Sequence, residues 1–238
     1  MIKIGVIGAR GRMGRRIIEL AKQDKDLLVS VGFEISGHPD TGKVIEKVKI
    51  TDNFDQAENC DCLIDFSSPD AGLKGLPSFI KLKKSIVIGT TGLQQEDLDK
   101  IKEASKYVPV VFSPNMSIGV TLLFKLLKQA AKTLKGYEVE VQEAHHIHKK
   151  DSPSGTAKKI VEVINNQGFN IKIKDVRAVR QGEIIGDHKV VFESSADKIV
   201  LGHYAKNRDI FAKGALTAAK WVVNKDKGLY SMEDVLGL

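Results

Sequence analysis

Residues 2–14 read IKIGVIGARGRMG, an apolar run that passes directly into a glycine-rich segment. The run Ile2–Ile7 predicts a buried strand, and the pattern after Gly14 predicts a helix. Gly8, Gly11 and Gly14 follow a GxxGxxG spacing, a variant of GxGxxG. A tight strand-to-helix turn needs glycine for steric reasons alone, so the spacing by itself decides little. In this strand–turn–helix context, however, free amides at the helix N-terminus can hold a pyrophosphate.

An acid farther along the chain strengthens this interpretation. Glu34 closes the second apolar run, about twenty residues past the last glycine, where a carboxylate can accept hydrogen bonds from an adenosine ribose. Glu34 repels a 2′-phosphate and Ile35 offers no charge to hold one, so the sequence favours NADH. Lys43 or His38 could swing in and restore some use of NADPH. The loop residues expected to contact the dinucleotide are Gly8, Ala9, Arg10, Gly11, Arg12 and Met13.

Short apolar runs and amphipathic segments alternate through the first half of the chain. Strands are predicted at 2–7, 27–33, 62–66, 86–88 and 108–112, and helices at 15–22 and 95–106. This alternation predicts an α/β fold, a Rossmann-type doubly wound parallel sheet with helices on both faces. Ligands of such sheets bind outside the carboxyl ends of the strands. Two strand ends carry further candidate cofactor contacts, Gly89, Thr90 and Thr91 in one and Ser113, Pro114, Asn115 and Met116 in the other. A plain glycine turn before a helix explains the first group equally well.

The pattern changes after residue 116. A long helix is predicted over 117–134, and then a strand from 137 with one solvent-facing side. Further strands at 171–179, 189–195 and 198–204 predict an α+β domain, a mixed or antiparallel sheet with helices on one side. A helix at 210–223 could pack back on the first domain. We therefore expect a dinucleotide-binding domain at 1–116, to which 207–238 returns, and a second domain at 117–206.

Composition excludes several classes of protein. Apolar residues make up 42% and charged residues 28% of the 238, as in an ordinary folded globular protein. The net charge of +7 could suggest nucleic acid, but the lysines are scattered and only 6% of residues are aromatic. Neither a signal peptide nor a membrane span is evident, so we expect a cytoplasmic protein. Cys60 and Cys62 are expected to be reduced, because no second pair completes a metal site.

The segment EAHHIHKKDSPSGTA, residues 143–157, holds three of the six histidines beside two lysines. Four interpretations are open. Zinc is disfavoured because no cysteine ligands or HExxH pattern accompany the histidines. A nucleophilic triad through Ser152 or Ser154 lacks the GxSxG elbow. A solvated polar loop is the third interpretation, and a cationic acid/base site for an anionic substrate is the fourth.

Local detail favours the fourth interpretation. Ser154 stands at the N-cap of a predicted helix, so the amides of Gly155 and Thr156 lie at its positive end, which binds carboxylates readily. Histidine titrates near neutral pH and lysine can donate a proton, so the site could neutralise carboxylates and supply a proton. Beside a dinucleotide domain, this predicts hydride addition coupled to protonation. The candidate residues are His145, His146, Lys149, Gly155 and Thr156.

From end to end the chain resembles the dihydrodipicolinate reductases, also called 4-hydroxy-tetrahydrodipicolinate reductases, of the diaminopimelate route to lysine. The segments that carry the resemblance are VIGARGRMG, IDFSSPD, IGTTGL, SPNMSIGV, EAHHIHKKDSPSGTA, HYAKNRDIFAKGAL and GLYSMEDVLGL. The histidine-lysine segment with PSGTA is highly specific, whereas the glycine loop alone is not. Ile35 departs from the family, because many members carry a basic residue there.

The resemblance implies reduction of a cyclic dicarboxylate formed from 4-hydroxy-tetrahydrodipicolinate, with loss of water, by NADH or NADPH and without a metal. His145 resembles the family's proton donor and acceptor, and Lys149 its second proton donor. His146, Gly155 and Thr156 resemble residues that hold the dicarboxylate. A homotetramer is also implied, with 117–206 as the substrate-binding and oligomerisation domain.

Two other functions compete with this one. A dehydrogenase of the same fold could act on another amino or imino dicarboxylate, although the specific segment 143–157 argues against it. A non-catalytic nucleotide sensor or nucleic-acid-binding protein is supported only by the isoelectric point near 9.2 and the glycine loop.

Overall fold

The computed structural model describes all 238 residues, which divide into two compact units. The first unit comprises Met1–Met116 and Phe211–Gly237, and the second is essentially Ser117–Ile210. The sequence placed the corresponding changes after residues 116 and 206. None of the helices combines the length and the apolar composition that a membrane span requires.

An eight-stranded sheet forms the centre of the first unit. Its strands are β1 (Ile2–Ile7), β2 (Leu27–Phe33), β3 (Val44–Ile45), β4 (Val48–Thr51), β5 (Cys62–Asp65), β6 (Ser85–Ile88), β7 (Pro109–Phe112) and β12 (Gly228–Tyr230). They lie in the order β12-β7-β6-β5-β1-β2-β4-β3, and every pair is parallel except β3 with β4. The strand order reverses between β1 and β5. The ligand crevice of such a sheet therefore lies outside the carboxyl ends of these two strands.

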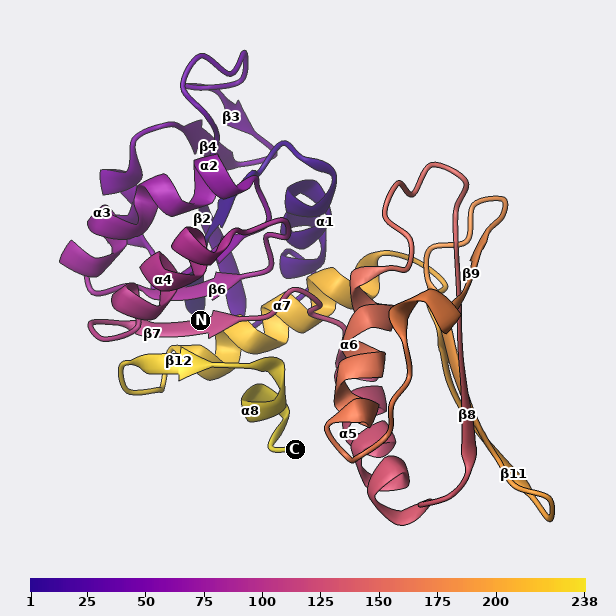
Figure 1. The fold of residues 1–238 in the computed structure, drawn as a ribbon. Coiled ribbons are helices and arrows are strands. Elements are labelled where there is room, and N and C mark those ends of the chain that lie inside the picture. The colour runs from indigo at the N-terminus through magenta and orange to yellow at the C-terminus, as the bar shows by residue number, and fades with distance from the viewer. The chain divides into compact units, whose positions relative to one another are not determined.

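Helices cover both faces of this sheet, as the ribbon shows (Figure 1). The helical segments are α1 (Arg12–Ala21), η1 (Phe54–Asn59), α2 (Pro69–Gly72), η2 (Leu73–Gly75), α3 (Leu76–Lys81), α4 (Gln95–Ala104), α7 (Asp209–Val222) and α8 (Met232–Leu236). Ile64 packs in the core formed with α1 and α7, whereas the next residue toward the N-terminus, Leu63, packs with α3 and α4. Burial of both faces makes these strands continuous apolar runs, and the predicted doubly wound sheet is confirmed.

A four-stranded sheet with helices on one face forms the second unit (Figure 1). Its elements are α5 (Ile118–Thr133), β8 (Glu138–His145), α6 (Gly155–Asn165), η3 (Ile173–Asp175), β9 (Arg177–Arg180), β10 (Asp187–Glu193) and β11 (Lys198–Tyr204). The order is β11-β10-β8-β9, with β8 parallel to β9 and the other pairs antiparallel. Val141 of β8 packs under α5 and α6, while Glu138 and Glu140 are exposed on the other face. The predicted α+β unit with a mixed sheet is confirmed.

The prediction of a strand over 171–179 is wrong in its first half. There the side chain of Asn165 donates to the Ile171 carbonyl at 2.9 Å and accepts from the Ile171 amide at 2.8 Å. Because one amide side chain satisfies both backbone groups of Ile171, the chain needs no strand partner at that point. A short 3₁₀ turn, η3, follows, and only Arg177–Arg180 pairs as β9.

Candidate active site

The glycine loop joins β1 to α1 in the geometry that the sequence predicts. Gly8 has a φ of +74°, which favours glycine, and its amide donates to the Phe33 carbonyl at 2.9 Å. At Gly14 an added Cβ would lie 2.1 Å from the Gly8 carbonyl oxygen, so only glycine lets the helix begin this close to the loop. Gly11 is the N-cap of α1 and offers no side chain, which leaves the first amides of the helix for a ligand.

Glu34 lies at the end of β2 and already contacts the loop. One carboxylate oxygen accepts from the Arg10 amide at 2.6 Å. The Arg10 side chain turns to Asp40, with Nε 2.7 Å from Oδ2, and Lys43 Nζ lies 3.2 Å from the other carboxylate oxygen of Asp40. These two contacts, first from Arg10 and then from Lys43, lower the pKa of Asp40. Asp40 thus holds Lys43, which the sequence offered for a 2′-phosphate, together with Arg10 of the glycine loop. The sequence did not predict this contact.

A cavity of about 420 Å³ opens outside the ends of β1 and β5. Its lining combines predicted cofactor residues with others that the sequence did not single out: Ile7, Gly8, Gly11, Glu34, Ile35, Ser36, Asp52, Phe54, Phe66, Ser67, Ser68, Ala71 and Lys74. The volume falls within the range of small-molecule sites. Its position at the strand-order reversal is the place where the doubly wound fold binds dinucleotides.

A buried carboxyl supports the second strand end that lines this cavity. Asp65 is 3% exposed, and its Oδ1 accepts from the Ser67 amide at 2.9 Å and the Ser67 hydroxyl at 2.6 Å. Burial raises the pKa of Asp65. Thr90 is 3% exposed, and its hydroxyl accepts from the Ser67 amide at 3.1 Å. The segment after β5 is therefore tied to the predicted segment 89–91 after β6.

The other predicted cofactor residues differ in exposure. Thr91 is exposed, whereas Met116 is 1% exposed and packs in the core against α7. An added Cβ at Gly214 of α7 would lie 1.7 Å from the Met116 carbonyl oxygen. Ser113 Oγ donates to the Asn115 carbonyl at 2.8 Å and so shapes the turn after β7. The Met116 side chain is thus structural, and any cofactor contact from it would involve the backbone.

In the second unit the strand register places four polar side chains on the helix-covered face of the sheet. Glu143 and His145 are two residues apart on β8 and so share a face. His188 of β10 lies directly opposite Glu143, and Arg180 of β9 lies directly opposite His145. Glu143, His145 and His188 are 2%, 7% and 4% exposed. We call these four residues and Ser154 the Glu143 cluster.

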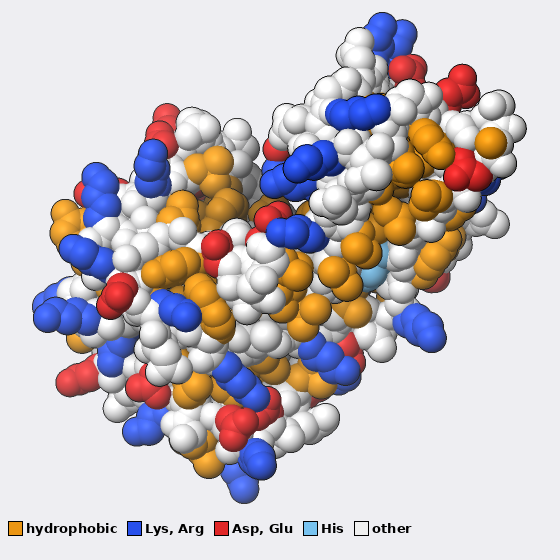
Figure 2. Space-filling model, turned by 90° about the horizontal axis from the view of Figure 1, so that it is seen from below, with side chains coloured by type: hydrophobic (Ala, Val, Ile, Leu, Met, Phe, Trp, Pro, Cys, Tyr) orange, Lys and Arg blue, Asp and Glu red, His pale blue; other side chains and the backbone are white.

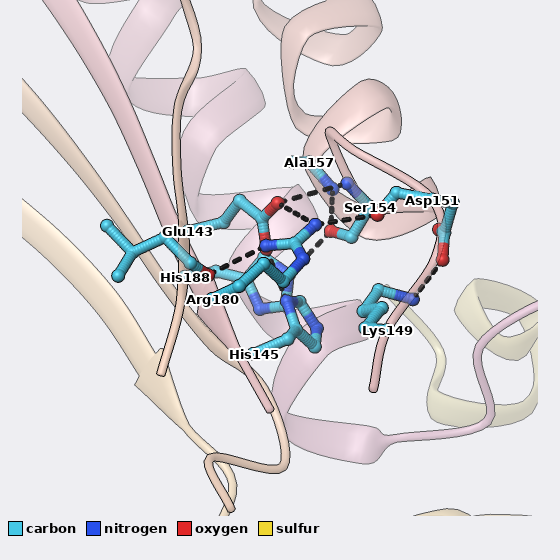
Figure 3. Close-up of polar contacts among 9 residues, drawn as sticks. Glu143, His145, Lys149, Asp151, Ser154, Ala157, Arg180 and His188 are labelled. Carbon is cyan, nitrogen blue, oxygen red and sulfur yellow. Dashed lines mark hydrogen bonds and ion pairs between the residues drawn. The ribbon is translucent and has the colours of Figure 1, made fainter. Parts of the chain in front are cut away.

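Hydrogen bonds join the cluster, as the close-up shows (Figure 3). Glu143 Oε2 contacts His145 Nδ1, and Glu143 Oε1 accepts from Arg180 Nη2 at 2.9 Å and from the Ser154 amide at 3.2 Å. The Ser154 hydroxyl lies 3.2 Å from His188 Nε2 and accepts from the Ala157 amide, which confirms the predicted N-cap of α6. His145, the predicted proton carrier, and the start of α6 are thus joined through one carboxylate.

Other predicted residues of this unit surround the cluster. Lys149 Nζ lies 2.7 Å from Asp151 Oδ1, and the His146 amide donates to the Ile184 carbonyl at 2.6 Å. Burial and the nearby Arg208 lower the pKa of His146. Gly155 and Thr156 form the first turn of α6. Several buried ring and guanidinium nitrogens have no protein partner, namely Nδ1 of His146, His188 and His203 and Nε of Arg180. Such atoms are available to a polar ligand.

The cluster also has the composition of a metal site. The ligand atoms of Glu143, His145 and His188 lie within 4.8 Å of one another, and burial lowers the pKa of His188 to about 3, which keeps its imidazole neutral as metal ligation requires. Arg180, however, already donates to Glu143, and its fixed positive charge opposes a second cation there. The sequence disfavoured a metal site because no cysteine ligands or HExxH pattern accompany the histidines. No local pattern could place His188 beside Glu143 and His145.

Basic side chains are dispersed among acidic ones on the face in Figure 2, in keeping with the scattered lysines of the sequence.

A doubly wound nucleotide fold combined with a histidine–carboxylate cluster is the arrangement of an oxidoreductase that uses a nicotinamide dinucleotide. Family models agree in detail: dihydrodipicolinate reductase, N-terminus, matches residues 2–116, and dihydrodipicolinate reductase, C-terminus, matches residues 119–236. The chain belongs to the dihydrodipicolinate reductase family.

Individual relatives show the same similarity over the whole chain. It is 43% identical to the 4-hydroxy-tetrahydrodipicolinate reductase of Aquifex aeolicus, covering 100% of this chain and 99% of that protein. The enzyme of the same name from Geotalea daltonii is 41% identical and is covered in full, as is this chain. The structure of a dipicolinate-bound dihydrodipicolinate reductase from Paenisporosarcina sp. TG-14 matches with a TM-score of 0.82 over 97% of each chain at 21% identity, which shows the shared fold.

Proposed function

We propose that this protein reduces 4-hydroxy-tetrahydrodipicolinate to tetrahydrodipicolinate, with loss of water, at the expense of NADH or NADPH in the diaminopimelate route to lysine. The observation that carries the proposal is that the Glu143 carboxylate contacts both His145 and the N-cap amide of α6. A proton carrier and a helix terminus suited to carboxylates therefore lie together. The names of the full-length relatives support the choice of substrate.

The residues around the first-unit cavity fit a nicotinamide dinucleotide. The positive φ of Gly8 and the close approach at Gly14 make room for a pyrophosphate at the start of α1. Glu34 would accept hydrogen bonds from the adenosine ribose, and Ile35, which lines the same cavity, carries no charge for a 2′-phosphate. We therefore favour NADH. Residues 8–13, 89–91 and 113–116 would supply the remaining contacts.

Within the second unit, His146, Gly155 and Thr156 would hold the carboxylates of the ring. The bound cofactor supplies a hydride, which carries both electrons of the reduction. His145 and Lys149 supply the proton that completes saturation of one double bond, and the positive charge around them stabilises the electron-rich ring before protonation. The hydroxyl of the substrate leaves as water together with a proton from the neighbouring ring carbon, which creates the double bond that the hydride and the proton then saturate. The balance therefore needs no further oxidant or reductant.

The arrangement of the second unit also supports self-association. The face of its sheet that no helix covers carries exposed apolar side chains on the edge strand β11, including Val200 and Tyr204, which are 48% and 61% exposed. We propose that this unit both binds substrate and forms a homotetramer, and that the enzyme works in the cytoplasm. Light scattering coupled to size-exclusion chromatography gives the mass of the assembly.

A coupled assay tests the reaction itself. The unstable substrate is generated in place by the upstream synthase from pyruvate and aspartate semialdehyde, and absorbance at the nicotinamide band is followed with NADH and separately with NADPH. Oxidation that needs both the synthase and this protein supports the proposal. If folded protein binds NADH but oxidises none, the result favours the alternative function, a dehydrogenase that acts on another amino or imino dicarboxylate. A screen of such dicarboxylates then identifies its substrate.

A further inference from the structure

The Glu143 carboxylate is the most enclosed charged group in the second unit. Its side chain is 0% exposed, and both of its oxygens are used: Oε2 by the His145 ring, and Oε1 by Arg180 and the Ser154 amide. Burial alone would raise the pKa of Glu143, but the hydrogen bonds with His145 and Arg180 outweigh it and lower the pKa to about 2. Glu143 is therefore an ionised acceptor at every pH at which the enzyme would work.

An ionised carboxylate accepts hydrogen bonds and donates none, so the nitrogen that contacts it must carry a proton. That nitrogen is Nδ1 of His145. The other ring nitrogen, Nε2, points to Gly186, where an added Cβ would lie 3.1 Å from it. In neutral His145, Nε2 is then the unprotonated nitrogen, and it lies beside the one residue type that leaves space next to it.

The surroundings hold Glu143 itself in place. Arg180 Nη2 donates to Glu143 Oε1 and also to the Asp151 carbonyl at 2.6 Å, and Arg180 Nη1 donates to the Val179 carbonyl at 2.7 Å. A guanidinium fixed at several points gives the carboxylate little freedom to turn away from His145. His188 stacks edge-on against His145, with ring centroids 5.2 Å apart, and limits movement of the ring from the other side.

We infer that Glu143 is a positioning residue for the proposed proton transfer: it fixes His145 with a proton on Nδ1, which makes Nε2 the atom that exchanges a proton with the substrate. The inference rests on the proposed function. The proton leaves Nε2 of the imidazolium for the reduced ring, and the Nδ1 proton stays in its bond to Glu143. Before the transfer, the Glu143 carboxylate balances the positive charge of the imidazolium. After the transfer the His145 ring is neutral and still bonded to Glu143, as a catalytic histidine is to its orienting acid in other enzymes. Solvent then restores the Nε2 proton.

The kinetic test replaces Glu143 with glutamine, which has the same shape and no charge. We expect Glu143→Gln to lower kcat on the order of 10²-fold, while KM and the NADH dissociation constant change less than threefold. Glu143→Asp should recover part of the loss. Glu140→Gln is the matched control, because it makes the same change on the exposed face of the same strand and should leave kcat unaltered. Retention of kcat within threefold in Glu143→Gln would overturn the inference.

A spectroscopic test does not depend on activity. In ¹⁵N-histidine-labelled protein, the His145 signals are assigned by their loss in His145→Gln, and for the neutral ring they should show a protonated Nδ1 and an unprotonated Nε2. A wild-type spectrum with the proton on Nε2 overturns the inference even if Glu143→Gln does not fold. If the tautomer is as expected but wild type oxidises no cofactor in the coupled assay, then the proposed function fails and the orientation of His145 stands.

Discussion

Lys149 and Asp151 form an ion pair, with Nζ 2.7 Å from Oδ1, at the start of the turn that leads into α6 (Figure 3). The Lys149 side chain is 22% exposed and that of Asp151 is 52% exposed. The structure therefore pairs the proposed second proton donor with a carboxylate of the chain itself. A substrate carboxylate would have to compete with Asp151 for the same ammonium group.

Removal of this competitor should tighten substrate binding. Exposed ion pairs are worth about 0.2–1 kcal/mol, so we expect Asp151→Asn to lower KM for the dicarboxylate by up to about fivefold. Asp175→Asn makes the same charge change at another exposed site of the unit and should leave KM unaltered. Initial rates over a range of substrate concentrations give both values. A KM that rises in Asp151→Asn would mean that Asp151 orients Lys149 for the substrate instead.

The two proposed proton carriers should matter for turnover and not for the cofactor. We expect His145→Gln and Lys149→Ala each to lower kcat about 10²-fold or more, because general acid–base groups contribute on that scale. Both residues belong to the second unit, whereas the cavity proposed for NADH lies in the first. The NADH dissociation constant should therefore not change, and fluorescence titration measures it. His148→Gln and Lys150→Ala, at exposed neighbouring positions, serve as controls. Parallel losses of NADH affinity would contradict the assigned roles.

Cofactor choice should depend on the position after Glu34. Ile35 is 59% exposed at the edge of the cavity, so an arginine there can reach a 2′-phosphate without disturbing the core. We expect Ile35→Arg to raise kcat/KM for NADPH about tenfold, because a charge-assisted hydrogen bond is worth roughly 1.5–3 kcal/mol. Leu28→Arg, at an exposed position of the preceding strand β2, is the control. Unchanged NADPH kinetics would place the 2′ position away from Glu34.

The sequence predicted the features that depend on local patterns, namely strands with a regular apolar pattern and turns marked by glycine. The strands at 2–7, 27–33 and 198–204 were predicted to the residue, and the first two apolar runs are bounded directly by Gly8 and Glu34. The hairpin β3–β4 was not predicted. Its turn, Glu46 and Lys47, adopts φ values of +50° and +69° without the glycine or asparagine that normally marks such a turn.

Part of the candidate active site was visible in the sequence and part was not. Glu143 and His145 alternate on one strand in step with Val139 and Val141, so a buried acid beside the histidine could have been read from the period of two. His188 joins them only through the pairing of β10 with β8. Arg180 does so only through β9. Register between distant strands is set by tertiary packing, which no local pattern reports.

His188 should make the stability of the protein depend on pH. Burial first, and then the nearby His145, lower the pKa of His188 from 6.5 to about 3. Between these two pH values the unfolded chain binds a proton at His188 and the folded chain does not. Stability is therefore fully present above about pH 6.5 and falls as the pH drops toward 3, by at most about 1.4 kcal/mol per pH unit from this group. Urea unfolding between pH 7.5 and 5 should show a weaker decline in His188→Gln than in wild type or in the exposed control His148→Gln. Equal declines in all three would mean that His188 is charged in the folded protein.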